Sequence, residues 1–217
     1  MELKKLVARY PRVFHMAERG TWPSIRERGL FSASGVLDVF HVAGPPRFAI
    51  ESEHRPEKVA VGEGPEKIVL RDQKPMEAGR LSKALLGDLT TRQWYETINS
   101  KVFFWAEEKR LLGLLNARAY RNLEHDVLTL DTASLLDEYH QQTWLCHMNS
   151  GNTFPVPHPR DLSVFQRIPQ YPVKASGLPV KEVVELVIDY HVPNIANHVV
   201  AVRRMKGATV LEQLPMV

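Results

Sequence analysis

Apolar and polar residues alternate most regularly near the end of the chain, in residues 179–193. The segment is rich in β-branched residues and has a proline at each boundary, which predicts a β-strand. Because side chains alternate along a strand, we expect one face to carry Val184, Leu186 and Ile188. Glu185 lies within the strand but points away from that apolar face. A carboxylate there has a partner or a function, unless its face is the solvated side of a half-buried sheet.

The rest of the chain divides into short helices and strands. Apolar periodicity, capping residues and glycines predict helices before Pro11 and over residues 21–30, 76–86, 90–99, 109–121 and 133–141. Apolar and aromatic runs predict strands over residues 12–16, 66–71, 101–105, 126–130, 143–147 and 198–203. Thr21 or Ser24 is expected to cap the second helix, and Thr90 and Gln93 form a capping box for the fourth.

Two stretches rich in proline separate these elements. Residues 44–64, which also contain several glycines and charges, are expected to form an exposed loop. Residues 152–179 contain only one short element, at 162–165. A turn at residues 193–194 is expected to join the last two strands as an antiparallel pair.

The order of elements predicts an α+β fold in which a mainly antiparallel sheet is combined with short helices. We find no internal repeat, no low-complexity segment and no shift in composition that marks a boundary. We therefore expect residues 1–217 to form a single domain, a size at which a substantial core can be buried.

Composition narrows the setting and the partners. With one cysteine, Cys146, an internal disulfide framework is excluded. The first residues lead into no apolar leader, and no run approaches the length of a membrane span. We therefore expect a cytoplasmic protein without a membrane partner. The net charge of +3 and the pI near 9.0 permit a polyanionic substrate, but no dense run of Lys and Arg forms a nucleic-acid-binding arm.

Several common chemistries lack their motifs. There is no phosphate-binding loop and no glycine fingerprint after a strand. The nine histidines form no zinc-type spacing, and His191 with His198 would lack a third ligand. Cys146 and His147 are neighbours on a strand and so point to opposite faces. These absences favour a metal-free mechanism that depends on few residues.

Three segments in order resemble the ADP-ribosyltransferase superfamily, and within it the bacterial DarT-like branch, which modifies nucleic-acid bases. The first is Val13-Phe14-His15-Met16-Ala17 followed by the helix and Gly-Leu of residues 22–30. The second is the aromatic strand Lys101-Val102-Phe103-Phe104-Trp105 with the helix after it. The third is residues 184–193, which look like the segment that carries the catalytic glutamate of the family, here Glu185.

The resemblance implies a split, strongly curved pair of sheets that holds NAD in a cleft. It assigns Glu185 to the oxocarbenium-like transition state, where a facing carboxylate stabilises developing positive charge. It assigns His15 to a ribose, and the main chain beside it, at Met16, to the nicotinamide carboxamide. His15 as an ordinary histidine at the end of a strand is the alternative.

The remaining ligand contacts have alternatives of their own. Trp105 or Phe104 would stack on nicotinamide, although core packing suits most of these aromatic residues. Arg71 would bind the pyrophosphate or the acceptor, unless it forms a structural salt bridge with Asp72 or another acid. Asn149 and Ser150 would hydrogen-bond the ligand, unless they form a plain turn.

Other features qualify the resemblance. Glu182 is a second carboxylate close to the start of the strand, where it can reach solvent. The Ser-Thr-Ser motif of the superfamily is missing, and Val183 stands where protein-arginine modifiers have an acidic residue, which disfavours an arginine acceptor. The whole chain is also similar to a bacterial family of unknown function through Leu70-Arg71-Asp72-Gln73, residues 102–105, Asn149-Ser150-Gly151 and the Glu185 strand.

Together the residues and the resemblance predict an NAD-dependent ADP-ribosyltransferase that uses NAD as co-substrate and no metal. The expected acceptor is a single-stranded nucleic acid or a small molecule, and a toxin of this kind would have a separate antitoxin. NAD hydrolysis, an NAD-dependent RNA phosphate transfer that needs a more basic cleft, and a non-catalytic binding module are the alternatives.

Overall fold

An eight-stranded sheet organises the protein in a computed structural model that describes residues 1–216. Its strands, in spatial order, are β12 (Thr209–Gln213), β11 (Val199–Lys206), β6 (Glu124–Asp131), β1 (Arg12–Glu18), β5 (Lys101–Trp105), β9 (Glu185–Asp189), β7 (Thr143–Cys146) and β8 (Phe165–Arg167). All of its strand pairs are antiparallel. The predicted combination of mainly antiparallel strands with short helices is therefore confirmed.

Two small sheets and a set of short helices surround the large sheet. The small sheets pair β2 (Leu30–Phe31) with β10 (His191–Val192) and β3 (Val59–Val61) with β4 (Ile68–Leu70). The α-helices are α1 (Leu3–Arg9), α2 (Trp22–Arg28), α3 (Ala33–Val39), α4 (Gly44–Glu51), α5 (Ala78–Ser82), α6 (Thr91–Asn99), α7 (Glu108–Leu115) and α8 (Thr132–Tyr139). Short 3₁₀ turns are η1 (Gly64–Glu66), η2 (Lys74–Met76), η3 (His140–Gln142), η4 (Leu162–Val164), η5 (Ile168–Gln170) and η6 (Ile195–Asn197).

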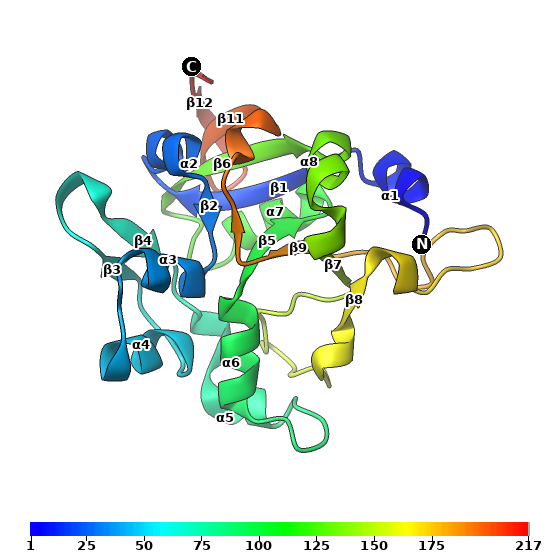
Figure 1. Cartoon of the computed structure of the whole chain (residues 1–217), viewed down its shortest axis with the longest axis horizontal. Coiled ribbons are helices and arrows are strands. Elements are labelled where there is room, and N and C mark those ends of the chain that lie inside the picture. The colour runs from blue at the N-terminus through cyan, green and yellow to red at the C-terminus, as the bar shows by residue number, and fades with distance from the viewer. Residues whose placement is uncertain (217) are drawn as a thin grey trace.

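Helices cover both faces of the large sheet (Figure 1). On one face, α1, α2 and α8 pack their apolar side chains against alternate strand residues such as Val13 and Leu186. On the other face, α5 and α6 pack against Val187, whereas α7 packs against Phe14 and Val127. Because β9 lies in the middle of the sheet, both of its faces are buried.

Strands β1 and β5 pair at a single position, Phe14 opposite Trp105. Beyond it, β1 continues along β6 as far as Glu18, while the rest of β5 pairs only with β9. The two neighbouring strands therefore diverge in the middle of the sheet. This divergence positions the site described below.

The N-termini of the helices are capped in some cases by local side chains and in others by residues distant in sequence. Thr90 and Gln93 form the predicted capping box at α6. At α2, neither Thr21 nor Ser24 caps the helix. Instead the buried carboxylate of Asp126, on β6, accepts hydrogen bonds from the N–H of Trp22, the first residue of the helix, at 3.4 Å and from the N–H of Gly20 at 2.8 Å. A residue more than a hundred positions away thus fulfils the role predicted for a local side chain.

Several predicted boundaries were wrong. Residues 44–64 contain α4 and β3 and are not a plain loop, and the segment between 32 and 43 contains α3. The helices predicted at 76–86 and 109–121 are shorter, as α5 and α7. The predicted final hairpin is absent, because β9 pairs with β5 and β7 whereas β11 pairs with β6 and β12.

The long strand predicted at 179–193 is broken into β9 and β10. Tyr190 lies between them with a φ of 68°, in the left-handed region that interrupts a strand. After the break, β10 leaves the large sheet and pairs with β2. No helix within the described residues has the length and apolar character that a membrane crossing requires.

Candidate functional site

A cleft of about 970 Å³ opens where β1 and β5 diverge. It is lined by every residue that the sequence analysis proposed for the site: His15, Met16, Arg71, Phe104, Trp105, Asn149, Ser150 and Glu185. These residues come from four strands or strand ends and one loop that are far apart in the chain. The fold therefore brings the predicted residues together around one cavity.

Glu185 begins β9 and lies in a cross-strand row with Trp105 on β5 and Cys146 on β7. Residues directly opposite each other on antiparallel strands point to the same face, so these three side chains are neighbours. Glu185 is only 4% exposed, and Val187 on the same face is fully buried. Glu185 therefore does not lie on a solvated face of a half-buried sheet, which was the alternative to a partner or a function for this carboxylate.

The carboxylate of Glu185 has few partners. The backbone N–H of Ser150 donates to its two oxygens at 3.3 and 3.2 Å, and Glu185 forms no ion pair with a described residue. Burial raises the pKa of Glu185 to about 7, although Ser150 and the charges of Arg160 and Arg110 oppose this rise. Near neutral pH this group is therefore divided between its protonated and ionised forms.

Arg160 fixes the loop that carries Ser150. Its guanidinium is 1% exposed and donates to the carbonyls of Ser150 at 2.9 Å, Asn152 at 2.7 Å and His158 at 3.1 Å. Three bonds from one planar group hold both ends of a turn. Arg160 thus positions the N–H that contacts Glu185.

His15 lies where β1 and β5 begin to diverge. Its Nδ1 is 2.8 Å from the carbonyl oxygen of Phe103, which can only accept, so Nδ1 carries the proton. Burial, with a contribution from the charge of Arg71, lowers the pKa of His15 to about 4. The ring is thus neutral, and Nε2 is an acceptor to which no described protein group donates.

The main chain after His15 forms a sheet edge inside the molecule. Past Phe14, β1 is paired with β6 on one side only. Met16 and Ala17 line the cleft, and no strand of the described residues pairs with β1 on its other side at these positions. An unpaired strand edge presents N–H and C=O groups that a ligand can bind.

Arg71 follows β4 directly and reaches the cleft from the opposite wall. Its guanidinium lies over the ring of Tyr120, 5.0 Å from the centroid. The predicted alternative, a salt bridge with Asp72, is absent: Asp72 accepts from the hydroxyl of Tyr120 at 2.7 Å, and Arg71 pairs with no carboxylate of the described residues. Its charge therefore remains available to an anion.

The two aromatic candidates differ in access. Phe104 is 1% exposed and belongs to the core beneath the sheet, so packing is its main role. Trp105 is partly exposed, contacts α7 and lies on the same face as Glu185. Of the two, Trp105 is the one whose ring offers surface to a ligand.

Asn149 and Ser150 have different roles in the turn at residues 149–151. The side chain of Asn149 accepts from the N–H of Gly151 at 3.1 Å, so it stabilises the turn itself. Ser150 supplies the N–H that contacts Glu185, and its buried hydroxyl meets no partner with hydrogen-bond geometry among residues 1–216. The turn and the ligand-binding interpretations therefore apply to different residues.

Positive charge dominates the cleft. Three acidic residues line it: Glu18, Asp72 and Glu185. Eight basic residues line it: Arg28, Arg55, Lys67, Arg71, Lys74, Arg80, Lys101 and Arg110. Among the described residues, Lys74, Lys101 and Arg110 pair with carboxylates, whereas the other five do not. The cleft is thus suited to an anionic ligand.

Sequence reasoning missed Arg55, Arg110 and Arg160. Arg110 has a local signal, because it lies in the first turn of α7, the helix that follows the aromatic strand. Arg55 and Arg160 lie in segments interpreted as loops and have no periodic or motif context. Only their buried hydrogen bonds in the folded chain identify them.

Within residues 1–216, no group of three or more His, Cys, Asp or Glu side chains is arranged to hold a metal ion. Cys146 is a buried free thiol beside Glu185, and burial raises its pKa far above the ordinary value. A thiolate nucleophile is therefore not favoured at this position.

Comparison with known proteins gives one match. The model of a family of unknown function (DUF7002) matches residues 11–199, and the chain belongs to this family. No curated protein and no solved structure matches the chain significantly. The matched range includes every cleft residue discussed above.

Proposed function

We propose that this member of the DUF7002 family binds NAD in the cleft between β1 and β5 and transfers its ADP-ribose to a nucleic-acid base or a small acceptor. The observation that carries the proposal is the cleft itself. It combines a buried carboxylate without an ion pair, Glu185, with a neutral histidine, His15, and an unpaired guanidinium, Arg71.

Glu185 would act on the bond between nicotinamide and ribose. As that bond breaks, nicotinamide leaves with the electron pair and the ribose becomes an oxocarbenium-like cation. An ionised carboxylate in a poorly solvated site stabilises this cation more than the neutral ground state of the ribose. The positive charge of the bound nicotinamide ring also favours ionisation of Glu185. The acceptor then attacks C1′ of the ribose and loses a proton.

The other residues would orient NAD. Nε2 of His15 accepts a hydrogen bond from a ribose hydroxyl, and the free edge of β1 at Met16 binds the carboxamide. Arg71 faces the pyrophosphate, for which a guanidinium has matching geometry. Trp105 offers an aromatic surface to the nicotinamide ring.

Two structural features support the ADP-ribosyltransferase-like form of this fold. β1 and β5 are joined at one position only, so the two halves of the large sheet separate beside His15, an arrangement in which strands can clasp a dinucleotide. Glu185 stands on a central strand next to that split. An open cleft and an unpaired Glu185 also favour an enzyme over a non-catalytic binding module.

The basic lining of the cleft favours a second candidate, NAD-dependent transfer of phosphate from RNA. Such an acceptor brings its own charge to the active site, and five lining cations have no carboxylate partner. Hydrolysis of NAD, with water as acceptor, uses the same residues up to departure of nicotinamide.

The experiment is incubation of the protein with labelled NAD and separate acceptors: single-stranded DNA, RNA, 2′-phosphorylated RNA, protein and water alone. We expect label on one nucleic acid, and its loss by at least about a hundredfold in Glu185→Gln. Glu182→Gln is the matched control, because Glu182 is half-exposed and bonded to Arg9 and Tyr10 outside the cleft. Label on no acceptor, without nicotinamide release, would reject the proposal.

A further inference from the structure

The position of Arg71 depends on a segment that leaves its sheet. Strand β4 ends at Leu70, and β3 pairs with it no further. Arg71, Asp72 and Gln73 then run along the wall of the cleft without a strand partner. Something other than sheet hydrogen bonds must hold this segment.

Arg55 holds residues 71–73 through hydrogen bonds. Its Nε donates to the carbonyl of Arg71 at 2.8 Å, and its Nη1 donates to the carbonyl of Ile50 at 2.7 Å. The backbone of Arg55 also bonds Gln73 in both directions: its carbonyl accepts from the N–H of Gln73 at 2.6 Å, and its N–H donates to Oε1 of Gln73 at 3.3 Å. The two residues flanking Asp72 are therefore fixed by one residue.

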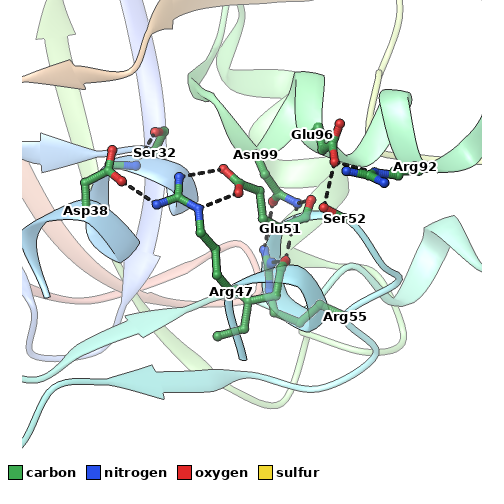
Figure 2. Close-up of polar contacts among 11 residues, drawn as sticks. Ser32, Asp38, Arg47, Glu51, Ser52, Arg55, Arg92, Glu96 and Asn99 are labelled. Carbon is green, nitrogen blue, oxygen red and sulfur yellow. Dashed lines mark hydrogen bonds and ion pairs between the residues drawn. The ribbon is translucent and has the colours of Figure 1, made fainter. Parts of the chain in front are cut away.

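Asn99, at the end of α6, connects this arrangement to the core. Its Oδ1 accepts from Arg55 at 3.3 Å and from the side chain of Gln73 at 3.0 Å. Its Nδ2 donates to the carbonyl of Glu51 at 2.8 Å. Figure 2 shows Asn99 and Arg55 in the same group of polar contacts as Glu51. Asn99 is 3% exposed, so both ends of its amide are used inside the protein.

Burial of the Arg55 guanidinium costs free energy of folding, because a charge is removed from water. Arg55 is 7% exposed, and no carboxylate pairs with it within residues 1–216. Burial lowers the pKa of Arg55 to about 10, a change that the charge of Asp72 opposes. An apolar side chain would pack here without the cost of desolvating a charge. The retained charge instead serves the cleft wall, which Arg55 and Asn99 both line.

We infer that Arg55 and Asn99 are positioning residues that hold Arg71 in place as the centre of an anion subsite. In the reaction proposed above, this subsite takes the pyrophosphate of NAD, and the inference rests on that proposal for the identity of the anion only. The backbone of Arg71 is fixed by Arg55, and its guanidinium is stacked on Tyr120. An arginine that is fixed at its backbone and at its guanidinium loses little conformational freedom when it binds a phosphate.

The chain provides a matched control in Arg47. Figure 2 shows its guanidinium between Asp38 and Glu51, in the same group of polar contacts. Arg47 connects α4 to α3, and none of its hydrogen bonds reaches residues 70–73. Replacement of Arg47 by Gln therefore removes side-chain bonds between α4 and α3 but no hydrogen bond of Arg55, Asn99 or residues 70–73.

The test is calorimetric titration of the full chain with NAD and, separately, with inorganic pyrophosphate. Single variants are Arg71→Ala, Asn99→Ala, Gln73→Ala and Arg47→Gln, and Asn99→Ala and Gln73→Ala are also combined with Arg71→Ala. Gln73→Ala is included because it removes bonds of the same group at a partly exposed residue, where the folded state is easier to retain. Circular dichroism confirms that each variant is folded.

We expect Arg71→Ala to weaken pyrophosphate binding by about tenfold or more, as for the loss of a hydrogen bond to a charged group. Asn99→Ala and Gln73→Ala should weaken it about fivefold alone but less than twofold in the Arg71→Ala background, because the lost effect acts through Arg71. Arg47→Gln should leave both affinities unchanged even where it lowers the melting temperature.

Other outcomes separate the inference from the proposed function. Equal losses in both backgrounds, or no loss from Asn99→Ala and Gln73→Ala, would overturn the positioning role. Arg71-dependent pyrophosphate binding without NAD binding would retain the subsite and reject the proposed function. If Arg71→Ala leaves pyrophosphate affinity unchanged, or if neither probe binds, the subsite itself is rejected.

Discussion

At the scale of single residues, the chemistry of the site depends on how Glu185 is buried. Its strand lies between two layers of apolar side chains, and within residues 1–216 only the N–H of Ser150 donates to its oxygens with hydrogen-bond geometry. Removal from water therefore outweighs the favourable contacts, and the pKa rises to about 7. The residue is ready to ionise when a cationic group enters the cleft.

The first prediction concerns stability and pH. Folding raises the pKa of Glu185 from 4.5 to about 7, so between these values the folded protein keeps a proton that the unfolded chain has released. The stabilisation of the folded state by this retained proton is fully present below pH 4.5 and is lost as the pH rises through about 7. Relative to Glu185→Gln, the wild type should lose on the order of 3 kcal/mol of unfolding free energy over this range, as measured by urea titration.

Glu182→Gln provides the control of opposite sign. The hydrogen bond from Tyr10 lowers the pKa of Glu182, so its contribution is present above the ordinary pKa and is lost in acid. A difference between wild type and Glu185→Gln that stays constant from pH 4.5 to 8 would contradict the burial of an ionisable Glu185.

The second prediction concerns turnover and pH. If the ionised form of Glu185 stabilises the transition state, kcat/KM for nicotinamide release, which reports the free enzyme, should rise with pH and level off above about 7. His15 should add no second inflection in this range, because burial lowers its pKa to about 4. A rate that falls between pH 6 and 8 would show that a protonated group is needed instead.

Residue types together with the resemblance selected Glu185, His15 and Arg71, and the structure shows that all three line one cleft. Of the three, Glu185 has the clearest local signal, because an acid within an apolar strand is costly to remove from water. Arg55 and Arg160 could not be predicted, because their bonds go to carbonyls of residues whose positions depend on the whole fold.

At the scale of elements, the site depends on where strands stop pairing. β1 leaves β5 after Phe14, and the last part of the predicted terminal strand leaves β9 at Tyr190. Its continuation, β10, packs against β2 and the end of α2. Both departures are decided by tertiary packing, so hydrophobic alternation predicted the strands but not their breaks.

The third prediction tests the packing between α2 and β10. Gly29 has a φ of 91°, and a Cβ at this position would lie 2.6 Å from the backbone Cα of Pro193. Gly29→Ala should therefore lower the unfolding free energy by about 3 kcal/mol or more, since backbone atoms must move. Gly20→Ala is the control, with a φ of 80° and no atom within 4 Å, and should lose only about 1 kcal/mol.

Both variants are measured by denaturant titration at one pH. Equal losses of unfolding free energy in the two variants would show that only the backbone conformation matters at Gly29. The close approach of α2 to residues 192–193 would then not limit the size of this residue.

At the scale of the whole molecule, most neighbouring strands of the large sheet are distant in sequence, with the β11–β12 hairpin as an exception. β1 contacts β5 and β6, whereas β9 lies between β5 and β7. Local patterns identify most of these strands but carry no information on which pairs form, which is why the predicted hairpin of β9 with β11 was wrong. The same long-range pairing brings Glu185 and His15 together, and Arg71 reaches them from the end of β4 in a separate small sheet, so the cleft is a property of the topology.

Charge is likewise a property of the whole cleft. The chain as a whole is only mildly basic, at +3. The cleft concentrates eight basic residues against three acidic ones. This local excess supports a ligand with phosphate groups more directly than the net charge does.

The central claim is that Glu185 in this cleft promotes cleavage of NAD, and release of free nicotinamide from NAD tests it most directly, because transfer and hydrolysis both require that step. We predict nicotinamide release by the wild type and by Glu182→Gln at similar rates, and a loss of at least about a hundredfold in Glu185→Gln. Release that persists in Glu185→Gln, or that is absent from the folded wild type with every acceptor offered, would contradict the account.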